Sequence, residues 1–334
     1  SINELDQTTG ITDPRNNTTH YSYNAFGDLI SETSPDRGTT TYTVDAAGNT
    51  LSRRDARETV ITYQYDALNR ITRISYPSDS SLNTTFAYDK PTGCGKSKGR
   101  LCSIKNSDGS VAYRYDHFGR ITRSTEKRGT LRFVTLYAYD AAGVLTKITL
   151  PSGRIVTYEL NADKQVNKIT ASIGGTPQIL ASSINYLPFG NIKNITYGNG
   201  LSLTNSYNTA YQLTARKVGT LMDESYSYDA AGNITVKGTT HYDYDALDRM
   251  LHENSAAGVY EYGYDAISNR LTGNENGINR VYSYPIDSSK LNSIDATAIN
   301  YDAAGNIVSD GQRNYSIDAA GHVRSVSSAG VITG

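Results

Sequence analysis

The chain has 334 residues, a formal net charge of −1 and 19% charged side chains. A protein without a strong basic or acidic field attracts nucleic acid and anionic membranes weakly, so neither is an expected partner. No apolar run reaches the length needed to span a bilayer. The chain has 27 Tyr against five Phe and no Trp, together with 29 Gly, a composition typical of strands and tight turns.

One motif recurs along the whole chain: an anchor residue, an Asp, a short turn of small residues and then an aliphatic residue. It is identical in Tyr228–Ile234 and in Tyr301–Ile307. Successive anchors lie 16 to 27 residues apart, a spacing that fits a β-hairpin and is too short for two packed helices. The anchors are Tyr23, Val44, Tyr65, Tyr88, Tyr115, Tyr139, Leu160, Tyr186, Tyr207, Tyr228, Tyr244, Tyr264, Tyr284, Tyr301 and Ile317.

The least regular unit spans residues 90–102 and contains both cysteines of the chain. Cys94 and Cys102 lie eight positions apart around glycine-rich sequence, a spacing that allows a disulfide across a hairpin or two separate thiols. Gly95, Lys96 and Ser97 resemble the end of a phosphate-binding loop, but the required earlier glycine is replaced by Lys90. We therefore interpret this stretch as a solvated basic loop.

The unit at residues 136–150 shows how one repeat folds. Alternation places Tyr137 and Tyr139 on one face, and Asp140 is positioned to accept hydrogen bonds from turn amides. Gly143 takes a positive φ without steric cost, so the chain reverses and returns as a second strand from Val144. Looser second turns then link one hairpin to the next, at 108–109, 151–153, 199–200 and 276–277.

Three carboxylates fall within six residues at Asp243, Asp245 and Asp248, which is one candidate for a Ca²⁺ site. Asp245 is also the ordinary turn residue of its repeat, and no glycine or distant Glu completes a calcium loop. The capped turn is the simpler interpretation. The sequence therefore predicts no catalytic residue, no metal site and no cofactor.

The pattern predicts an all-β fold: a spiralling antiparallel β-hairpin ribbon, solenoid-like, in a single array of about 15 hairpin units over residues 1–334. Coiling follows from the native twist of strands and hides long sheet edges. A β-propeller is the alternative, because two hairpins could build one four-stranded blade. No two-hairpin super-period supports that alternative. The chain is expected to be a fragment of a longer protein.

These motifs resemble the YD repeats of Rhs proteins, which are related to the shells of insecticidal toxin complexes and of teneurins. The resemblance covers residues 20–325, and the copies at 65–71 and 115–121 follow the family pattern closely. The residues that carry it as structural repeat anchors are Tyr65, Asp66, Tyr115, Asp116, Tyr139, Asp140, Tyr228, Asp229, Gly232, Tyr244, Asp245, Tyr264, Asp265, Tyr301, Asp302 and Gly305.

The resemblance implies a non-enzymatic, hollow β-shell that encloses a C-terminal toxin or effector polypeptide of the same protein until delivery. Delivery would take place outside the producing bacterial cell, with a component of a secretion apparatus as a further partner. The family's self-cleaving segment, rich in DPxG motifs, does not occur before Gly334, so no proteolytic residue is transferred. A cell-surface adhesion module that binds carbohydrate or protein through the exposed tyrosines is the alternative function.

Overall fold

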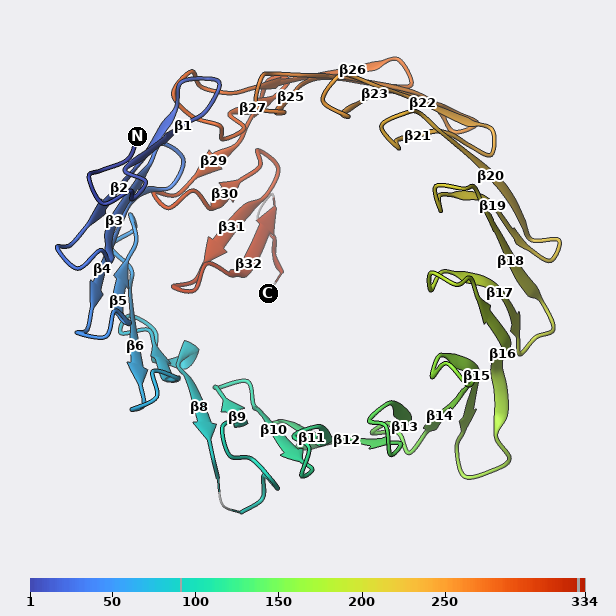
Figure 1. The fold of residues 1–334 in the computed structure, drawn as a ribbon. Coiled ribbons are helices and arrows are strands. Elements are labelled where there is room, and N and C mark those ends of the chain that lie inside the picture. The colour runs from blue at the N-terminus through green and yellow to red at the C-terminus, as the bar shows by residue number, and fades with distance from the viewer. Residues whose placement is uncertain (91, 329–330, 334) are drawn as a thin grey trace. The chain divides into compact units, whose positions relative to one another are not determined.

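A computed structural model describes residues 1–90, 92–328 and 331–333. The chain divides into two compact units, of which unit 1 comprises residues 1–86, 249–252 and 257–334 and unit 2 comprises residues 87–248 and 253–256. Unit 1 thus joins the first repeats to the last ones. One boundary between the units falls within β8 (Thr84–Tyr88), and the others fall just before, within and just after β23 (Met250–Ser255) (Figure 1).

Unit 1 consists of antiparallel hairpins from both ends of the chain. Its first part has β1 to β7 and one 3₁₀ turn; its second part begins at β24, and β29 to β33 form a five-stranded sheet. The strands are β1 (Gly10–Thr12), β2 (Thr18–Tyr23), β3 (Leu29–Ser34), β4 (Gly38–Val44), β5 (Thr50–Arg54), β6 (Val60–Tyr65), β7 (Ile71–Ser75), β24 (Gly258–Tyr264), β25 (Arg270–Glu275), β26 (Ile278–Ser283), β27 (Ser293–Ile294), β28 (Thr297–Ala298), β29 (Asn300–Tyr301), β30 (Ile307–Ser309), β31 (Asn314–Ile317), β32 (Val323–Ser328) and β33 (Val331–Thr333).

Unit 2 is one uninterrupted run of paired strands. From β9 to β22 every strand pairs antiparallel with the next one along the chain. The strands are β9 (Leu101–Lys105), β10 (Ser110–Tyr115), β11 (Ile121–Arg128), β12 (Leu131–Tyr139), β13 (Leu145–Thr149), β14 (Ile155–Leu160), β15 (Val166–Ser172), β16 (Gln178–Tyr186), β17 (Ile192–Tyr197), β18 (Ser202–Tyr207), β19 (Leu213–Val218), β20 (Met222–Tyr228), β21 (Ile234–Lys237) and β22 (Thr240–Tyr244).

These pairings confirm the predicted all-β, antiparallel hairpin fold and replace the propeller alternative, whose blades would interrupt such a run every four strands. Among the described residues the one helical element is the 3₁₀ turn Ser80–Leu82. No helix in this part of the chain is long and apolar enough to cross a membrane.

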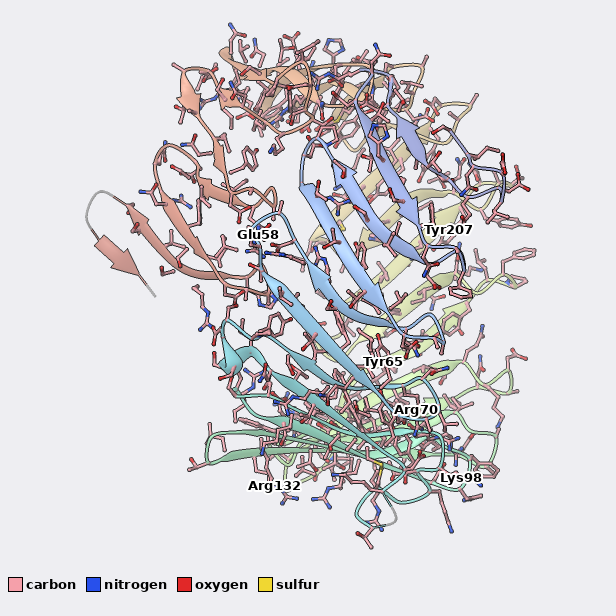
Figure 2. The ribbon with its side chains drawn as sticks, turned by 90° about the vertical axis from the view of Figure 1, so that its left-hand side faces the viewer. Glu58, Tyr65, Arg70, Lys98, Arg132 and Tyr207 are labelled. Atoms are coloured by element: carbon pink, nitrogen blue, oxygen red, sulfur yellow. A yellow bond between two sulfur atoms is a disulfide. The ribbon has the colours of Figure 1, made fainter. Side chains whose placement is uncertain are left out.

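The sheet is thin, and its side chains are mostly half-buried rather than packed into a central core (Figure 2). No side chain of the described residues is less than 2% exposed. Stability must therefore come from contacts between neighbouring hairpins, as in other repeat proteins. The buried apolar residues that are described are Ile61, Cys94, Cys102, Ala171, Ala181, Ile184, Leu203, Tyr282 and Ile299.

Each repeat places its turns on two opposite rims of the sheet. We call the rim formed by the anchor–Asp turns the Asx-turn rim, and the rim formed by the looser turns the second-turn rim. In the hairpin β6–β7, Tyr65 and Arg70 flank an Asx turn (Figure 2), whereas residues 55–59 between β5 and β6 belong to the second-turn rim.

Candidate functional site: the interlocked hairpins and the seam of unit 1

The anchor tyrosines fasten each hairpin to the one before it. The phenol of Tyr139 donates a hydrogen bond of 2.8 Å to the carbonyl of Ile121, the first residue of the return strand in the preceding repeat. The same bond, 2.7 to 2.9 Å long, recurs from Tyr23 to Thr8, Tyr65 to Thr50, Tyr115 to Leu101, Tyr186 to Val166, Tyr207 to Ile192, Tyr228 to Leu213, Tyr244 to Ile234, Tyr264 to Met250 and Tyr301 to Leu291.

This bond explains why tyrosine is preferred over phenylalanine at the anchors. Phenylalanine would offer the same ring to the sheet but would leave the facing carbonyl without the phenol donor. Burial raises the pKa of Tyr65, Tyr139 and Tyr244, so the phenols stay protonated and able to donate over a wider pH range.

Most Asx turns are closed by the carboxylate of their own Asp, and the turns after Tyr23, Leu160 and Tyr207 are closed by the side-chain oxygen of an Asn. In the turn after Tyr65, Asp66 Oδ1 accepts the backbone N–H groups of Leu68 at 2.9 Å and of Arg70 at 3.0 Å, while Oδ2 accepts Arg70 Nε at 2.8 Å. The bond from the Arg70 side chain is the main reason why the pKa of Asp66 lies below its usual value. In the turn after Tyr228, Asn233 takes the position of Arg70, and its side-chain amide donates a hydrogen bond from Nδ2 to Oδ2 of Asp229 at 3.0 Å.

A β-bulge, which the alternating strand pattern does not predict, accompanies these turns. Tyr115 pairs with Ile121 and Arg114 pairs with Arg123, so Thr122 has no partner in the ladder. Its hydroxyl instead donates to the carbonyl of Arg114 at 3.2 Å. Thr72 and Thr146 make the equivalent bond, so a threonine after the first aliphatic residue was the available sequence signal.

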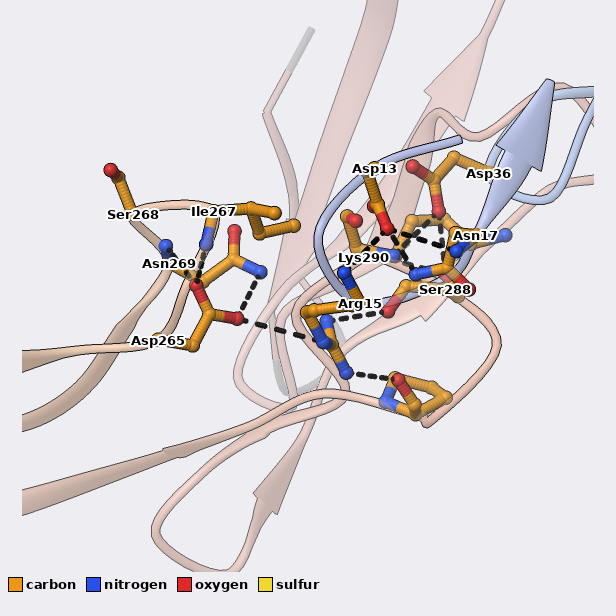
Figure 3. A network of polar contacts seen from close by, with 12 residues as sticks. Asp13, Arg15, Asn17, Asp36, Asp265, Ile267, Ser268, Asn269, Ser288 and Lys290 are labelled. Atoms are coloured by element: carbon orange, nitrogen blue, oxygen red, sulfur yellow. Dashed lines mark hydrogen bonds and ion pairs between the residues drawn. The ribbon is translucent and has the colours of Figure 1, made fainter. Parts of the chain in front are cut away.

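In unit 1 the Asx-turn rim of the last repeats lies against the second-turn rim of the first ones, and we call this contact the seam (Figure 3). The Arg15 guanidinium donates to the carbonyls of Ser288 at 3.0 Å and Pro285 at 2.6 Å. Its Nε lies 3.6 Å from the carboxylate of Asp265, and both of these charged side chains are largely buried.

Asp36 continues the seam from the next second turn. Its Oδ1 accepts hydrogen bonds from the Ser288 hydroxyl at 2.6 Å and from the Ser289 amide at 2.8 Å (Figure 3). Ser288 is only 6% exposed, so this carboxylate provides an acceptor for the proton of a buried hydroxyl. Close by, a Cβ atom on Gly305 would meet the carbonyl oxygen of Asp36 at 2.7 Å, so the seam requires glycine there.

Arg57 forms the third step of the seam. It pairs with the buried Asp55 beside it at 2.7 Å and reaches across to the carbonyl of Asp318 at 3.0 Å and the carboxylate of Asp302 at 3.7 Å. Arg324 then pairs with Asp79 at 2.5 Å at the last described step. The seam is thus held by arginines and carboxylates that bond to backbone groups as well as to each other.

The structure places the other sequence-predicted residues as follows. Cys94 and Cys102 are joined by a disulfide with their Cα atoms 5.6 Å apart. The buried hydroxyl of Ser97 donates to the Lys90 carbonyl, and no helix follows it. Asp248 accepts a bond from Asn233, and no group of three metal-ligating side chains occurs in the described part of the chain.

Comparisons with known proteins agree with this geometry. An RHS repeat family model matches residues 3–42, 44–81 and 97–131, and no curated protein matches the chain. A crystal structure of TcdB2-TccC3-Cdc42 superimposes with a TM-score of 0.79 at 16% identity, over 95% of this chain and 20% of that one.

A second TcdB2-TccC3 crystal structure gives a TM-score of 0.75 at 16% identity, over 92% of this chain and 21% of that one. A structure of the Photorhabdus luminescens Tc holotoxin pore gives a TM-score of 0.78 at 16% identity, over 95% of this chain and 20% of that one. The chain spans about a fifth of the length of these proteins. Residues 3–42, 44–81 and 97–131 thus match RHS repeats, and the fold of the chain is similar to that of the TcdB2-TccC3 structures.

Proposed function

We propose that this chain is a wall segment of an RHS shell that encloses a C-terminal toxin or effector polypeptide of the same protein until delivery outside the producing cell. The observation that carries the proposal is the match of 95% of the chain to a TcdB2-TccC3 chain. The protein's role is then steric: it separates its cargo from the surroundings and performs no chemistry on it.

The contacts described above suit a wall. Consecutive hairpins are joined by backbone ladders and by tyrosine phenols, and the seam joins one rim to the other. The tyrosine hydroxyls donate their hydrogen bonds to backbone carbonyls of the sheet, which favours a structural role for these side chains over carbohydrate binding. The adhesion alternative gains no specific support from the described residues.

Limited proteolysis of the full-length natural product tests the proposal. A cargo downstream of Gly334 is expected to resist protease and to co-purify with the repeats, and to become sensitive when Gly305→Val opens the seam. Lys98→Ala, a change in an exposed loop of unit 2, is the matched control and should leave protection unchanged. A downstream segment that is digested beside intact repeats would refute enclosure.

A further inference from the structure

The sheet of unit 2 carries a group of like charges on one face of β10, β11 and β12. In the register of these strands, Arg114 lies directly opposite Arg123, and Lys127 lies directly opposite Arg132. Because residues two positions apart on a strand share a face, all four cations project from the same side of the sheet. We call these four side chains the basic cluster, and Figure 2 labels its member Arg132.

No carboxylate of these strands balances the basic cluster. The strands β9, β10, β12 and β13 contain no acidic residue. The single acidic residue of β11 is Glu126, which lies on the other face and accepts a hydrogen bond from Arg128. Within the described part of the chain, none of the four cations forms an ion pair with a carboxylate. Like charges directly opposite each other destabilise a sheet, so an anion bound between them would be stabilising.

The basic cluster surrounds a hollow with an unused hydrogen-bond donor. The hollow has a volume of about 260 Å³, and Thr125 lines it between the four cations. Arg123 is half-buried, and its Nε atom is buried and donates to no atom of the described residues. A buried charged donor without an acceptor is unfavourable, so this guanidinium is suited to a ligand that brings acceptor oxygens. The other three cations are exposed and accessible to such a ligand.

The loop that the Cys94–Cys102 disulfide closes borders the hollow. The backbone N–H of Tyr115 donates to the carbonyl of Cys94 at 3.0 Å, which attaches the loop to the end of β10. A Cβ atom on Gly95 would lie 3.2 Å from Cγ of Arg114, so the loop packs against the stem of that arginine. The position of Arg114 is therefore fixed before any ligand arrives, which lowers the entropic cost of binding.

We propose that the basic cluster binds an oligophosphate, a compact ligand or part of a ligand in which at least two phosphate groups are linked. An extended strand places Arg123 and Lys127 about 13 Å apart, so one anionic group does not serve both cation pairs. Guanidinium groups bind phosphate through paired hydrogen bonds, and lysine adds a point charge. Linked phosphates bring several negative charges into a small volume, which a single carboxylate does not. The inference does not depend on any enclosed cargo.

Titration calorimetry of the full-length natural product with inorganic tripolyphosphate tests the inference. Arg123→Gln and Lys127→Gln should each weaken binding by about 10- to 100-fold, the range expected for hydrogen bonds to charged groups. Arg73→Gln is the matched control, because Arg73 is an exposed strand arginine of β7 whose cross-strand partners, Gln64 and Thr85, are uncharged. Its affinity for tripolyphosphate should equal that of the wild type. Inorganic monophosphate should bind the wild type more weakly than tripolyphosphate does.

Thermal unfolding gives a second measurement that separates lost binding from lost folding. Without ligand, Arg123→Gln should keep or raise the unfolding midpoint, because it removes a like-charge pair. With tripolyphosphate, the midpoint of the wild type should rise and that of Arg123→Gln should not.

Three results would each overturn the proposal. They are the absence of tripolyphosphate binding to the wild type, equal affinities of Arg123→Gln and Arg73→Gln, and equally tight binding of a polyglutamate peptide, which would indicate an unspecific basic surface. None of these results bears on the enclosure of a cargo, which the proteolysis experiment tests separately.

Discussion

Two identical sequence motifs in different surroundings allow the seam to be tested directly. Tyr228–Ile234 and Tyr301–Ile307 have the same seven residues, and their glycines, Gly232 and Gly305, both have positive φ values, of +96° and +82°. Replacing either glycine by alanine should cost about 1 to 2 kcal/mol, because an L-residue is strained in this region. The local cost is therefore the same in both variants.

The two glycines differ in the atoms that an added Cβ would meet. A Cβ atom on Gly232 would have Gln212 Nε2 as its nearest neighbour at 3.5 Å, an ordinary contact. On Gly305 it would lie 2.7 Å from the backbone oxygen of Asp36, so Gly305→Ala must push the two rims apart. We expect a further cost of about 1 to 3 kcal/mol, the usual range for overpacking.

Hydrogen exchange at the amide of Ser289 reports on this movement, because that amide donates to Asp36 across the seam. Gly305→Ala should accelerate its exchange by about tenfold for each 1.4 kcal/mol of local destabilisation, whereas Gly232→Ala should leave it unchanged. Equal exchange at Ser289 in the two variants would show that the rims do not touch at Gly305 and would refute the reasoning.

Three further predictions concern single contacts. Tyr139→Phe should destabilise its hairpin by about 1 kcal/mol, which would be measured as roughly fivefold faster local hydrogen exchange. Tyr137→Phe, for whose hydroxyl no bond is described, is the control. Equal effects of the two substitutions would argue against the phenol bond of Tyr139. Arg57→Gln should lower the free energy of unfolding by about 2 to 3 kcal/mol, because it leaves the buried Asp55 without its cation. Residues 55–58 should then become sensitive to protease. An unaltered cleavage pattern would contradict the role of Arg57 in the seam. Burial raises the pKa of the phenols of Tyr65, Tyr115, Tyr139, Tyr244 and Tyr301, so the stabilisation from their hydrogen bonds should be complete below about pH 10 and lost as the pH rises through the higher folded-state pKa. A denaturation midpoint constant across that range in the wild type would contradict this.

Much of the repeat was predictable because its information is local. An Asp after an anchor and a glycine three residues later suffice to indicate a turn, and Asp140 and Gly143 occupy those positions in the structure. The bulge at Thr122 was missed because strand periodicity carries no signal for one unpaired residue. The partner of each anchor phenol was missed because it is a backbone atom, which has no sequence signature.

The seam could not be predicted from the sequence alone. Arg15 and Arg57 stand in short polar loops that look solvated, and their partners lie more than 240 residues away. Local patterns fix each hairpin but leave open the small twist between consecutive hairpins. That twist, added over many repeats, decides which distant turns meet.

The acceptor of the phenol bond determines which substitutions this link tolerates. Because a main-chain carbonyl is present at every position, the partner of each anchor tyrosine can change its side chain without breaking the bond. Only the tyrosine in each link must therefore be a particular residue, and units as different in length as 16 and 27 residues make the same bond, at Tyr244 and at Tyr115.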